Sequence, residues 1–444
     1  MSLSTPLPLP YGERETALVL GGGGAKGSYE IGVFDALSLL GIRAGFVCGT
    51  SVGALNAALY AQGAFEEAAA LWARLQLSDI VAEEMLSQAE RLETVMTRPD
   101  KLLDSIAKYG KQKGLDISPL RSLIKRYAPE SRLRASHIEF GLAVTRVSNL
   151  SLVDKTLPEM AKGSLTDWLL ASSACFPAFP LQEIDGELYA DGGFCDNIPV
   201  CMALRRGARH VIAVDIGKHR THTRYDKRPD VTYIRASRPL GKFLEFDPDR
   251  AAFNRGIGRN DTLRAFRALA GYAFAFDPRD AAASEPSARD FVETLSRLES
   301  ALTPARAVRL NASEASPLFH PLEEGMTGGD HGPIGYWLRA CEFACELAGL
   351  SPLPIYTMES LRAALIQALP LGEARLLSTR IPESAAMLFA KPKLSRRLAV
   401  ATLAFQIGKS GPDAPLLLRT AESAPREFLT ALLLHLLLTG AMAV

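Results

Sequence analysis

The chain has 444 residues, of which 48% are hydrophobic and 22% are charged, a balance that indicates a folded globular protein and excludes a disordered one. A chain of this length exceeds the size at which one hydrophobic core usually stops growing, so we expect two domains. The 50 Lys and Arg residues nearly match the 49 Asp and Glu residues, which excludes a global positive field that would recruit nucleic acid.

The amino terminus lacks the pattern of a secretory signal. Residues 1–15 contain prolines where an apolar core should follow a basic start, so the sequence predicts an N-terminal tail and a cytoplasmic protein. The six cysteines form no CxxC pair, and a chain of this size does not depend on a disulfide framework. We expect reduced thiols and no cysteine-bound metal at Cys48, Cys175, Cys195, Cys201, Cys341 and Cys345.

Two strand–turn–helix units follow the tail directly. An apolar run at 17–20 precedes four glycines and a helical pattern over about 28–40. A second run at 45–48 precedes a turn at 49–53 and an alanine-rich helix. Consecutive units of this kind predict a parallel α/β sheet. Further strands are expected at 140–147, 187–190 and 210–214.

Beyond about residue 245 the sequence has almost no strand pattern. Apolar residues recur with helical spacing at 334–347 and 358–369. The sequence therefore predicts an α/β domain over 16–300 and an α-helical domain of unknown role over 301–444.

Ser51 stands at the centre of a Gly-Thr-Ser-Val-Gly turn between a strand and a helix. A Gly-x-Ser-x-Gly turn in this position exposes the serine hydroxyl at the carboxyl end of the sheet. The positive end of the following helix dipole favours an alkoxide there. Gly49 and Gly53 keep Cβ atoms out of the crowded bend. The pattern predicts a nucleophile, and the alternative is a serine that only caps the helix.

The glycine run after the first strand has three interpretations. A dinucleotide-binding loop fits G-x-G-x-x-G over 22–27, but it requires an acid about twenty residues later, and residues 46–49 contain none. A P-loop requires Ser or Thr directly after its lysine, whereas Lys26 is followed by Gly27. The third interpretation is an oxyanion hole, in which backbone N–H groups converge beside the neighbouring Ser51 turn.

The residues alone leave the general base open. Asp191 follows the predicted strand 187–190 in an Asp-Gly-Gly sequence. A partly desolvated carboxylate beside Ser51 would have a raised pKa and could accept its proton, although an isolated Asp-Gly-Gly is more often an ordinary turn. None of the seven histidines follows a strand in a context typical of a catalytic triad: His137, His210, His219, His222, His320, His331 and His435.

Three ordered motifs, GGGAKG at 22–27, GTSVG at 49–53 and DGG at 191–193, resemble the patatin-like phospholipase family. The stretch LLASSACFPAFPLQEIDGELYADGG also resembles that family's approach to its aspartate, with Ala178 where the family often has glycine. The resemblance covers about 16–220 and fades by about 300. It implies a three-layer α/β/α sandwich with a mainly parallel central sheet, and lipid acyl hydrolysis of the phospholipase A or lysophospholipase type without metal or cofactor.

By this resemblance Ser51 and Asp191 form a dyad without histidine. Ser51 carries the acyl group, and Asp191 is the general base first toward Ser51 and then toward water. The resemblance assigns the oxyanion hole to the backbone of Gly22, Gly23 and Gly24. The residues that support the motifs are Lys26, Gly27, Gly49, Gly53, Gly192 and Gly193. Lys26 is expected to support the loop in preference to meeting an anionic headgroup.

Lipid substrates imply transient contact with a membrane or micelle surface. Residues 205–228 hold eight Lys or Arg residues against two Asp and could meet anionic headgroups. The uncharged residues 428–444 are expected to form a buried helix, with interfacial insertion as the second interpretation. Two other functions stay open: an α/β-hydrolase-type esterase or acyltransferase with a Ser–His pair, and a lipid-binding protein without catalysis.

Overall fold

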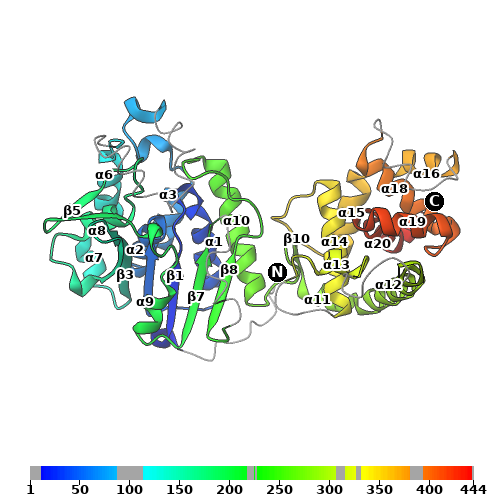
Figure 1. Cartoon of the computed structure of the whole chain (residues 1–444), viewed down its shortest axis with the longest axis horizontal. Coiled ribbons are helices and arrows are strands. Elements are labelled where there is room, and N and C mark those ends of the chain that lie inside the picture. Colours follow the sequence, from blue (N-terminus) through cyan, green and yellow to red (C-terminus); the bar gives the residue numbers. More distant parts are fainter. Residues whose placement is uncertain are drawn as a thin grey trace. The chain divides into compact units, whose positions relative to one another are not determined.

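The computed structural model describes residues 12–87, 114–217, 225, 228–306, 316–326, 332–380 and 394–442. Contacts within the chain divide it into two compact units. The N-terminal unit is Pro6–Phe266, and the C-terminal unit is formed mainly by Arg267–Val444 (Figure 1).

The N-terminal unit is built on an eight-stranded sheet in the order β5-β6-β3-β2-β1-β7-β8, with β4 also paired to β3. The parallel pairs are β1 with β2, β1 with β7, β2 with β3 and β7 with β8, whereas β4 and β6 run antiparallel to β3. The strands are β1 (Thr16–Leu20), β2 (Phe46–Thr50), β3 (Glu139–Arg146), β4 (Ser151–Thr156), β5 (Gln182–Ile184), β6 (Glu187–Asp191), β7 (His210–Asp215) and β8 (Val231–Arg235).

The three central strands β1, β2 and β7 are buried along their whole length. A strand covered on both faces needs apolar side chains at every position, which explains why these sequences are continuous apolar runs without alternation. The predicted mainly parallel α/β sheet is confirmed. The short strands β4, β5 and β8 were not predicted, because they carry too few residues or too many polar ones to give a clear pattern.

Helices cover both faces of this sheet (Figure 1). Helix α2 packs on β1, β2 and β3, α10 packs on β8, and α1 packs on α2 and α10. Helix α9 packs on β1, β2 and β7, and its Val200 and Met202 share a core with Ala17 and Val19. The three-layer expectation is confirmed. The helices are α1 (Ser28–Leu39), α2 (Val52–Ala61), α3 (Phe65–Trp72), α6 (Ser118–Tyr127), α7 (Glu130–Arg134), α8 (Leu165–Ser172), α9 (Val200–Arg205) and α10 (Pro248–Ala265).

Short 3-10 helices connect several of these elements. Two of them follow strands of the sheet directly: η2 (Gly24–Gly27) after β1 and η7 (Gly192–Phe194) after β6. The others are η1 (Glu13–Glu15), η3 (Leu77–Asp79), η4 (Glu83–Met85) and η6 (Leu157–Glu159).

The division between the units falls at Phe266, earlier than the predicted boundary at 300. Helix α10 belongs to the N-terminal unit because it packs along α1, where a Cβ on Gly32 would lie 1.9 Å from the Arg255 carbonyl oxygen. The next helices belong instead to the C-terminal core, to which Ala288 and Phe291 contribute. The end of the strand pattern in the sequence does not reveal which unit each of these helices packs against.

Over its described residues the C-terminal unit is helical apart from one pair of two-residue parallel strands, β9 (Ala275–Phe276) and β10 (Ile355–Tyr356). The predicted helical region is therefore confirmed. Its helices are α11 (Pro278–Ala283), α12 (Glu285–Arg306), α13 (Phe319–Glu323), α14 (Pro333–Ala348), α15 (Met358–Ala368), α16 (Leu371–Arg380), α18 (Arg396–Ser410), α19 (Pro415–Ser423) and α20 (Pro425–Met442).

The apolar carboxyl-terminal segment forms most of α20, which packs on α18, α14 and α19. Phe428, Leu432 and Leu438 are buried in the core of the unit. This confirms the predicted buried helix as far as residue 438. Among the helices that the structure describes, none combines the length and apolar character needed to cross a bilayer.

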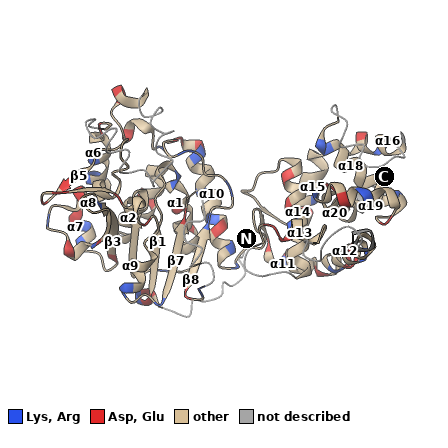
Figure 2. Cartoon of the chain, viewed as in Figure 1, with Lys and Arg blue, Asp and Glu red and all other residues tan. Residues whose placement is uncertain are grey.

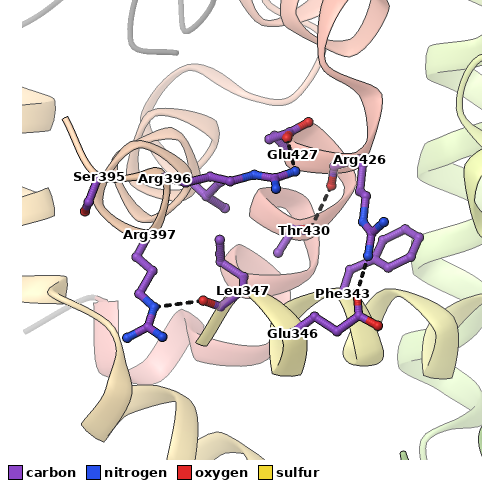
Figure 3. A pocket seen from close by; sticks show the side chains of 10 residues that line it. Phe343, Glu346, Leu347, Ser395, Arg396, Arg397, Arg426, Glu427 and Thr430 are labelled. Carbon is purple, nitrogen blue, oxygen red and sulfur yellow. Dashed lines mark hydrogen bonds and ion pairs between the residues drawn. The ribbon is translucent and has the colours of Figure 1, made fainter. Parts of the chain in front are cut away.

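A pocket of about 450 Å³ opens between α14, α18 and α20 within this unit (Figure 3). Arg396 pairs with Glu427, and Arg426 pairs with Glu346. The Arg426 guanidinium also lies 4.4 Å from the centre of the Phe343 ring. These contacts tie the three helices together, so the arginines act as structural links.

Lys and Arg residues are interspersed with Asp and Glu in the view of Figure 2.

Glu342 anchors the start of the C-terminal unit to α14. Its side chain is fully buried, and Oε1 accepts the backbone N–H groups of Tyr272, Ala273 and Phe274 at 2.6, 2.7 and 3.0 Å. Its other oxygen, Oε2, accepts Arg339 Nη1 at 2.8 Å. A buried carboxylate is tolerated only with such complete pairing.

Glu342→Gln should destabilise the C-terminal unit, because the amide removes the charge that the three N–H groups and Arg339 surround. Breaking a buried charged pair costs about 3–5 kcal/mol. Urea unfolding followed by circular dichroism measures the loss, with exposed Glu359→Gln on α15 as the matched control. Equal unfolding midpoints for the two variants would contradict this assignment.

Candidate active site

Strands β2 and β6 meet end to end beside β3. One edge of β3 is occupied by β4. On the opposite edge Ala143 pairs with Thr50, the last residue of β2, and the next residue, Val144, pairs with Asp191, the last residue of β6. Ser51 follows Thr50 into the junction between these two strand ends. Sheet register alone therefore brings Ser51 and Asp191 together, although 139 residues of sequence separate them.

Ser51 forms the turn between β2 and α2 in a left-handed backbone conformation, with φ 57° and ψ −127°. Such a conformation is unfavourable for a residue with a side chain and concentrates at functional sites. The Ser51 hydroxyl hydrogen-bonds to Asp191, and both residues are only 5% exposed. The Asp191 carboxylate also accepts the Gly193 N–H at 2.8 Å, and the Asp191 N–H donates to the Ala174 carbonyl at 3.0 Å.

Burial raises the pKa of Asp191 to about 6, even though hydrogen bonds from Ser51 and Gly193 favour the charged form. A carboxyl group with this pKa is ionised at neutral pH and is more basic than an exposed aspartate. It can therefore accept the proton of a hydroxyl that attacks a carbonyl carbon.

Ser172 fills the junction between the ends of β2 and β6. It is fully buried at the end of α8, and its Oγ accepts the Ser51 N–H at 3.0 Å and donates to the Ala143 carbonyl at 2.8 Å. The Ser51 N–H is thereby engaged and does not face a reacting oxygen. Sequence reasoning missed Ser172, because a serine at the end of a helix has no chemical signature of its own.

The glycine loop after β1 lies directly against the nucleophile. A Cβ on Gly22 would lie 3.1 Å from Ser51 Cβ. The Gly22 N–H donates to the Asn197 carbonyl at 3.2 Å, and Asn197 Nδ2 donates to the Gly22 carbonyl at 3.1 Å. The N–H groups of Gly23 and Gly24 have no hydrogen-bond acceptor among the described residues. Of the three predicted donors, these two are the ones that remain for an oxyanion.

The other motif residues stand where chain segments touch. A Cβ on Gly53 or Gly192 would lie 2.4 Å from a backbone atom of a neighbouring strand, and a Cβ on Gly49 would lie 2.4 Å from Gly53 across the turn. Gly27 and Gly193 would meet side chains instead, at 2.6 Å from Val52 Cγ2 and 2.9 Å from Asn197 Oδ1. Lys26 is only 8% exposed within η2, and this burial favours its expected role in supporting the loop.

No histidine among the described residues contacts Ser51. His137 is exposed and pairs with Glu13 at 3.2 Å. His210 begins β7 at the opposite end of the sheet, and its pKa is lowered by burial. His320 and His435 belong to the C-terminal unit, whereas His219, His222 and His331 lie outside the described residues.

All six cysteines are free thiols, of which Cys48, Cys341 and Cys345 are buried and Cys195 is exposed. Within the described ranges, no group of three or more His, Cys, Asp or Glu side chains is arranged to hold a metal ion.

A family model described as patatin-like phospholipase matches residues 18–204, a range that begins within β1 and contains the Ser51 turn and Asp191. This match confirms the resemblance to the patatin-like phospholipase family over these residues.

The patatin-like domain is similar to parts of much longer proteins. It is 28% identical over 208 residues to "Patatin-like phospholipase domain-containing protein 6" of Mus musculus, covering 45% of this chain and 13% of that protein. It is 30% identical over 205 residues to "Lysophospholipase nte1" of Aspergillus terreus, covering 46% of this chain and 12% of that protein. The chain thus matches about an eighth of these relatives, at 13% and 12% of their lengths.

The solved structure of VipD from Legionella pneumophila aligns with 96% of this chain and 91% of its own chain. The identity is 14% and the TM-score is 0.40, values too low to support an inference about either unit.

Ser172→Ala should weaken the nucleophile turn, because the buried Ser51 N–H loses its acceptor. An unpaired buried donor costs about 1–3 kcal/mol. We expect reduced unfolding stability and at least tenfold slower labelling of Ser51 by a fluorophosphonate. The neighbouring Ser173→Ala is a matched control, because the Ser173 hydroxyl is buried without a hydrogen-bond partner among the described residues. Identical behaviour of the two variants would reject the role of Ser172.

Proposed function

We propose that this chain is a lipid acyl hydrolase of the phospholipase A or lysophospholipase type that works through an acyl-enzyme on Ser51. The observation that carries this proposal is the junction of β2 and β6 on β3, which brings the Ser51 hydroxyl to the buried Asp191 carboxylate. The patatin-like domain supports a lipid ester as the substrate. The fungal relative named as a lysophospholipase favours a substrate with a single acyl chain.

In the first step Asp191 accepts the hydroxyl proton while Ser51 Oγ attacks the ester carbonyl carbon. The N–H groups of Gly23 and Gly24 bind the oxyanion of the tetrahedral intermediate. Loss of one such donor typically costs about 3 kcal/mol of barrier. When the intermediate collapses, the bond to the leaving oxygen breaks and Asp191 returns its proton to that oxygen. The alcohol leaves, and the acyl group stays on Ser51.

The second step reverses these roles with water as the nucleophile. Asp191 accepts a proton from water as the water oxygen attacks the acyl carbonyl carbon. Collapse of the second intermediate breaks the bond to Ser51 Oγ, which recovers the proton. A free fatty acid is released, and the resting dyad is restored without a metal or cofactor.

Long-chain substrates require the proposed enzyme to contact a membrane or micelle, and we place it in the cytoplasm with transient peripheral contact. The basic segment 205–228 is a weaker candidate for this contact than its composition suggested. Its described arginines each pair with a carboxylate: Arg205 with Asp154, Arg206 with Glu139, Arg209 with Glu15 and Arg228 with Asp230. Residues 218–224 and 226–227 lie outside the described residues.

Replacing either dyad residue tests the proposal. Ser51→Ala should abolish release of fatty acid from mixed phospholipids and lysophospholipids, measured by mass profiling of the products. Asp191→Asn keeps the shape but cannot accept a proton, so we expect a loss of about 10²–10⁴-fold in kcat. The exposed Asp185→Asn serves as the control for the charge change.

Each alternative function predicts a different result from the same experiment. Unchanged hydrolysis by Asp191→Asn, with loss on replacement of one histidine, would establish a Ser–His pair. Lipid binding without fluorophosphonate labelling of the native protein would indicate a non-catalytic lipid-binding protein.

The acid side of the pH profile should report Asp191. Its carboxyl group is protonated below a pKa of about 6 and cannot then accept the Ser51 proton. We expect kcat/KM to fall about tenfold per pH unit below 6 and to level off above it. Hydrolysis of a soluble short-chain ester between pH 4.5 and 7.5 measures this, with circular dichroism to confirm folding at each pH. An inflection near pH 4 would contradict a desolvated base.

A further inference from the structure

Another buried carboxyl group, that of Glu30, lies beneath the glycine loop and takes no part in the proposed mechanism. Glu30 is in the first turn of α1 and is completely buried. Asn56 Nδ2 donates to Glu30 Oε2 at 2.7 Å and to the Gly27 carbonyl at 3.0 Å. Trp72 Nε1 donates to Asn56 Oδ1 at 2.9 Å, which fixes the orientation of the amide.

This network joins the two loops of the candidate site from behind. Gly27 ends η2, which begins at Gly24, one of the two oxyanion donors in the proposed mechanism. Asn56 lies on α2, the helix that starts directly after Ser51. A Cβ on Gly27 would lie 2.6 Å from Val52 Cγ2, so the loop and the helix are already in close contact. A shift of Glu30 or Asn56 would therefore move the glycine loop relative to the nucleophile.

The surroundings of Glu30 favour the neutral acid. Burial raises the pKa of Glu30 to about 8, although the Asn56 amide and the Gly21 N–H oppose part of the rise. The Gly21 N–H itself donates to the Val214 carbonyl at 3.1 Å, and Glu30 Oε1 is buried with no hydrogen-bond partner among the described residues. A proton on Oε1 avoids an unpaired buried charge.

No charge on the packed elements contributes to this shift. Helix α2 carries Tyr60 as its only ionisable side chain, and η2 carries Lys26. On α3, Glu66 and Glu67 are exposed. The charged groups of α1 and α10 pair with each other or within α10: Asp35 with Arg255, and Asp261 with Tyr29 and Arg264. The remaining charged side chains of α10 are Asp249, Arg250 and Arg259.

We propose that Glu30 is a positioning residue that, as the neutral acid, holds the glycine loop against the helix of the nucleophile through Asn56. The inference deepens the proposed function and rests on it for its effect on catalysis. Ionisation of Glu30 would place an unpaired charge in the core and force the loop to rearrange to admit water. The oxyanion donors would then lose their alignment with Ser51. Hydrolysis should therefore decline as Glu30 ionises above pH 8.

Glu30→Gln tests this, because glutamine keeps the acceptor oxygen for Asn56 and cannot ionise. We expect native kcat on a soluble ester to fall about tenfold per pH unit above 8, whereas the Glu30→Gln profile stays level to pH 9.5. Glu30→Ala should lower kcat at every pH, which Gln rescues. The exposed Glu66→Gln is the matched control and should retain the native alkaline decline. The same decline in Glu30→Gln as in the native protein would overturn the proposal.

Trp72 gives a measurement that does not require activity. Its indole bonds to Asn56, so tryptophan fluorescence should change near pH 8 in the native protein and remain constant in Glu30→Gln and Trp72→Phe. Absence of this Glu30-dependent transition would overturn the inference even in an inactive preparation. Hydrolysis that survives Ser51→Ala would instead refute the proposed function, whatever the fluorescence shows.

Discussion

The meeting of β2 and β6 along one edge of β3 is the constraint on which the candidate site depends. A parallel strand and an antiparallel strand end at adjacent residues of the same neighbour, Ala143 and Val144. The backbone can therefore supply no further ladder bonds across the junction. Side chains occupy the gap instead: Ser172 bonds the Ser51 N–H, and Ser51 bonds Asp191. The interruption in strand pairing thus leaves a place inside the apolar core where the polar groups of Ser51, Asp191 and Ser172 come together.

The same core holds two carboxyl groups in different electrostatic states. Asp191 and Glu30 are both desolvated, but Asp191 has two hydrogen-bond donors to its carboxylate, whereas Glu30 has one good donor and an unpaired oxygen. Their pKa values, about 6 and about 8, lie on either side of neutral pH. At pH 7 Asp191 is therefore ionised and can act as a base, whereas Glu30 is mainly the neutral acid, and the different hydrogen-bond donors to the two carboxyl groups contribute to this difference.

The sequence predicted the elements whose signal is local. The continuous apolar runs identified β1, β2 and β7, and the Gly-x-Ser-x-Gly pattern placed Ser51 at a strand–helix turn. The residues around Asp191 do not distinguish a catalytic aspartate from an ordinary Asp-Gly-Gly turn. Its assignment as the general base rested on the family resemblance. The end-to-end register that brings it to Ser51 is a property of β3, far away in sequence.

Residues that act through tertiary contacts left no such signal. No sequence pattern distinguishes Ser172, Asn197 and Glu30 from other polar residues. Only their hydrogen bonds in the folded protein connect them to the site. The unit boundary at Phe266 was missed for the same reason, because α10 is assigned by what it packs against and not by its pattern.

The direct contact between Ser51 and Asp191 also limits how the proposed chemistry can work. In a Ser-His-Asp triad an imidazole with a pKa near neutrality stands between the hydroxyl and the carboxylate. Here the strand junction brings the carboxylate to the hydroxyl itself, so no imidazole lies between them. A carboxylate at its ordinary pKa would be a poor base at neutral pH, and the fold compensates by burying it to 5% exposure. Further burial or loss of the Gly193 bond would raise the pKa of Asp191 further, and greater exposure would lower it and weaken the carboxylate as a base. Burial of Asp191 at the end of β6 raises its basicity, and the Gly193 N–H in the following turn limits the rise.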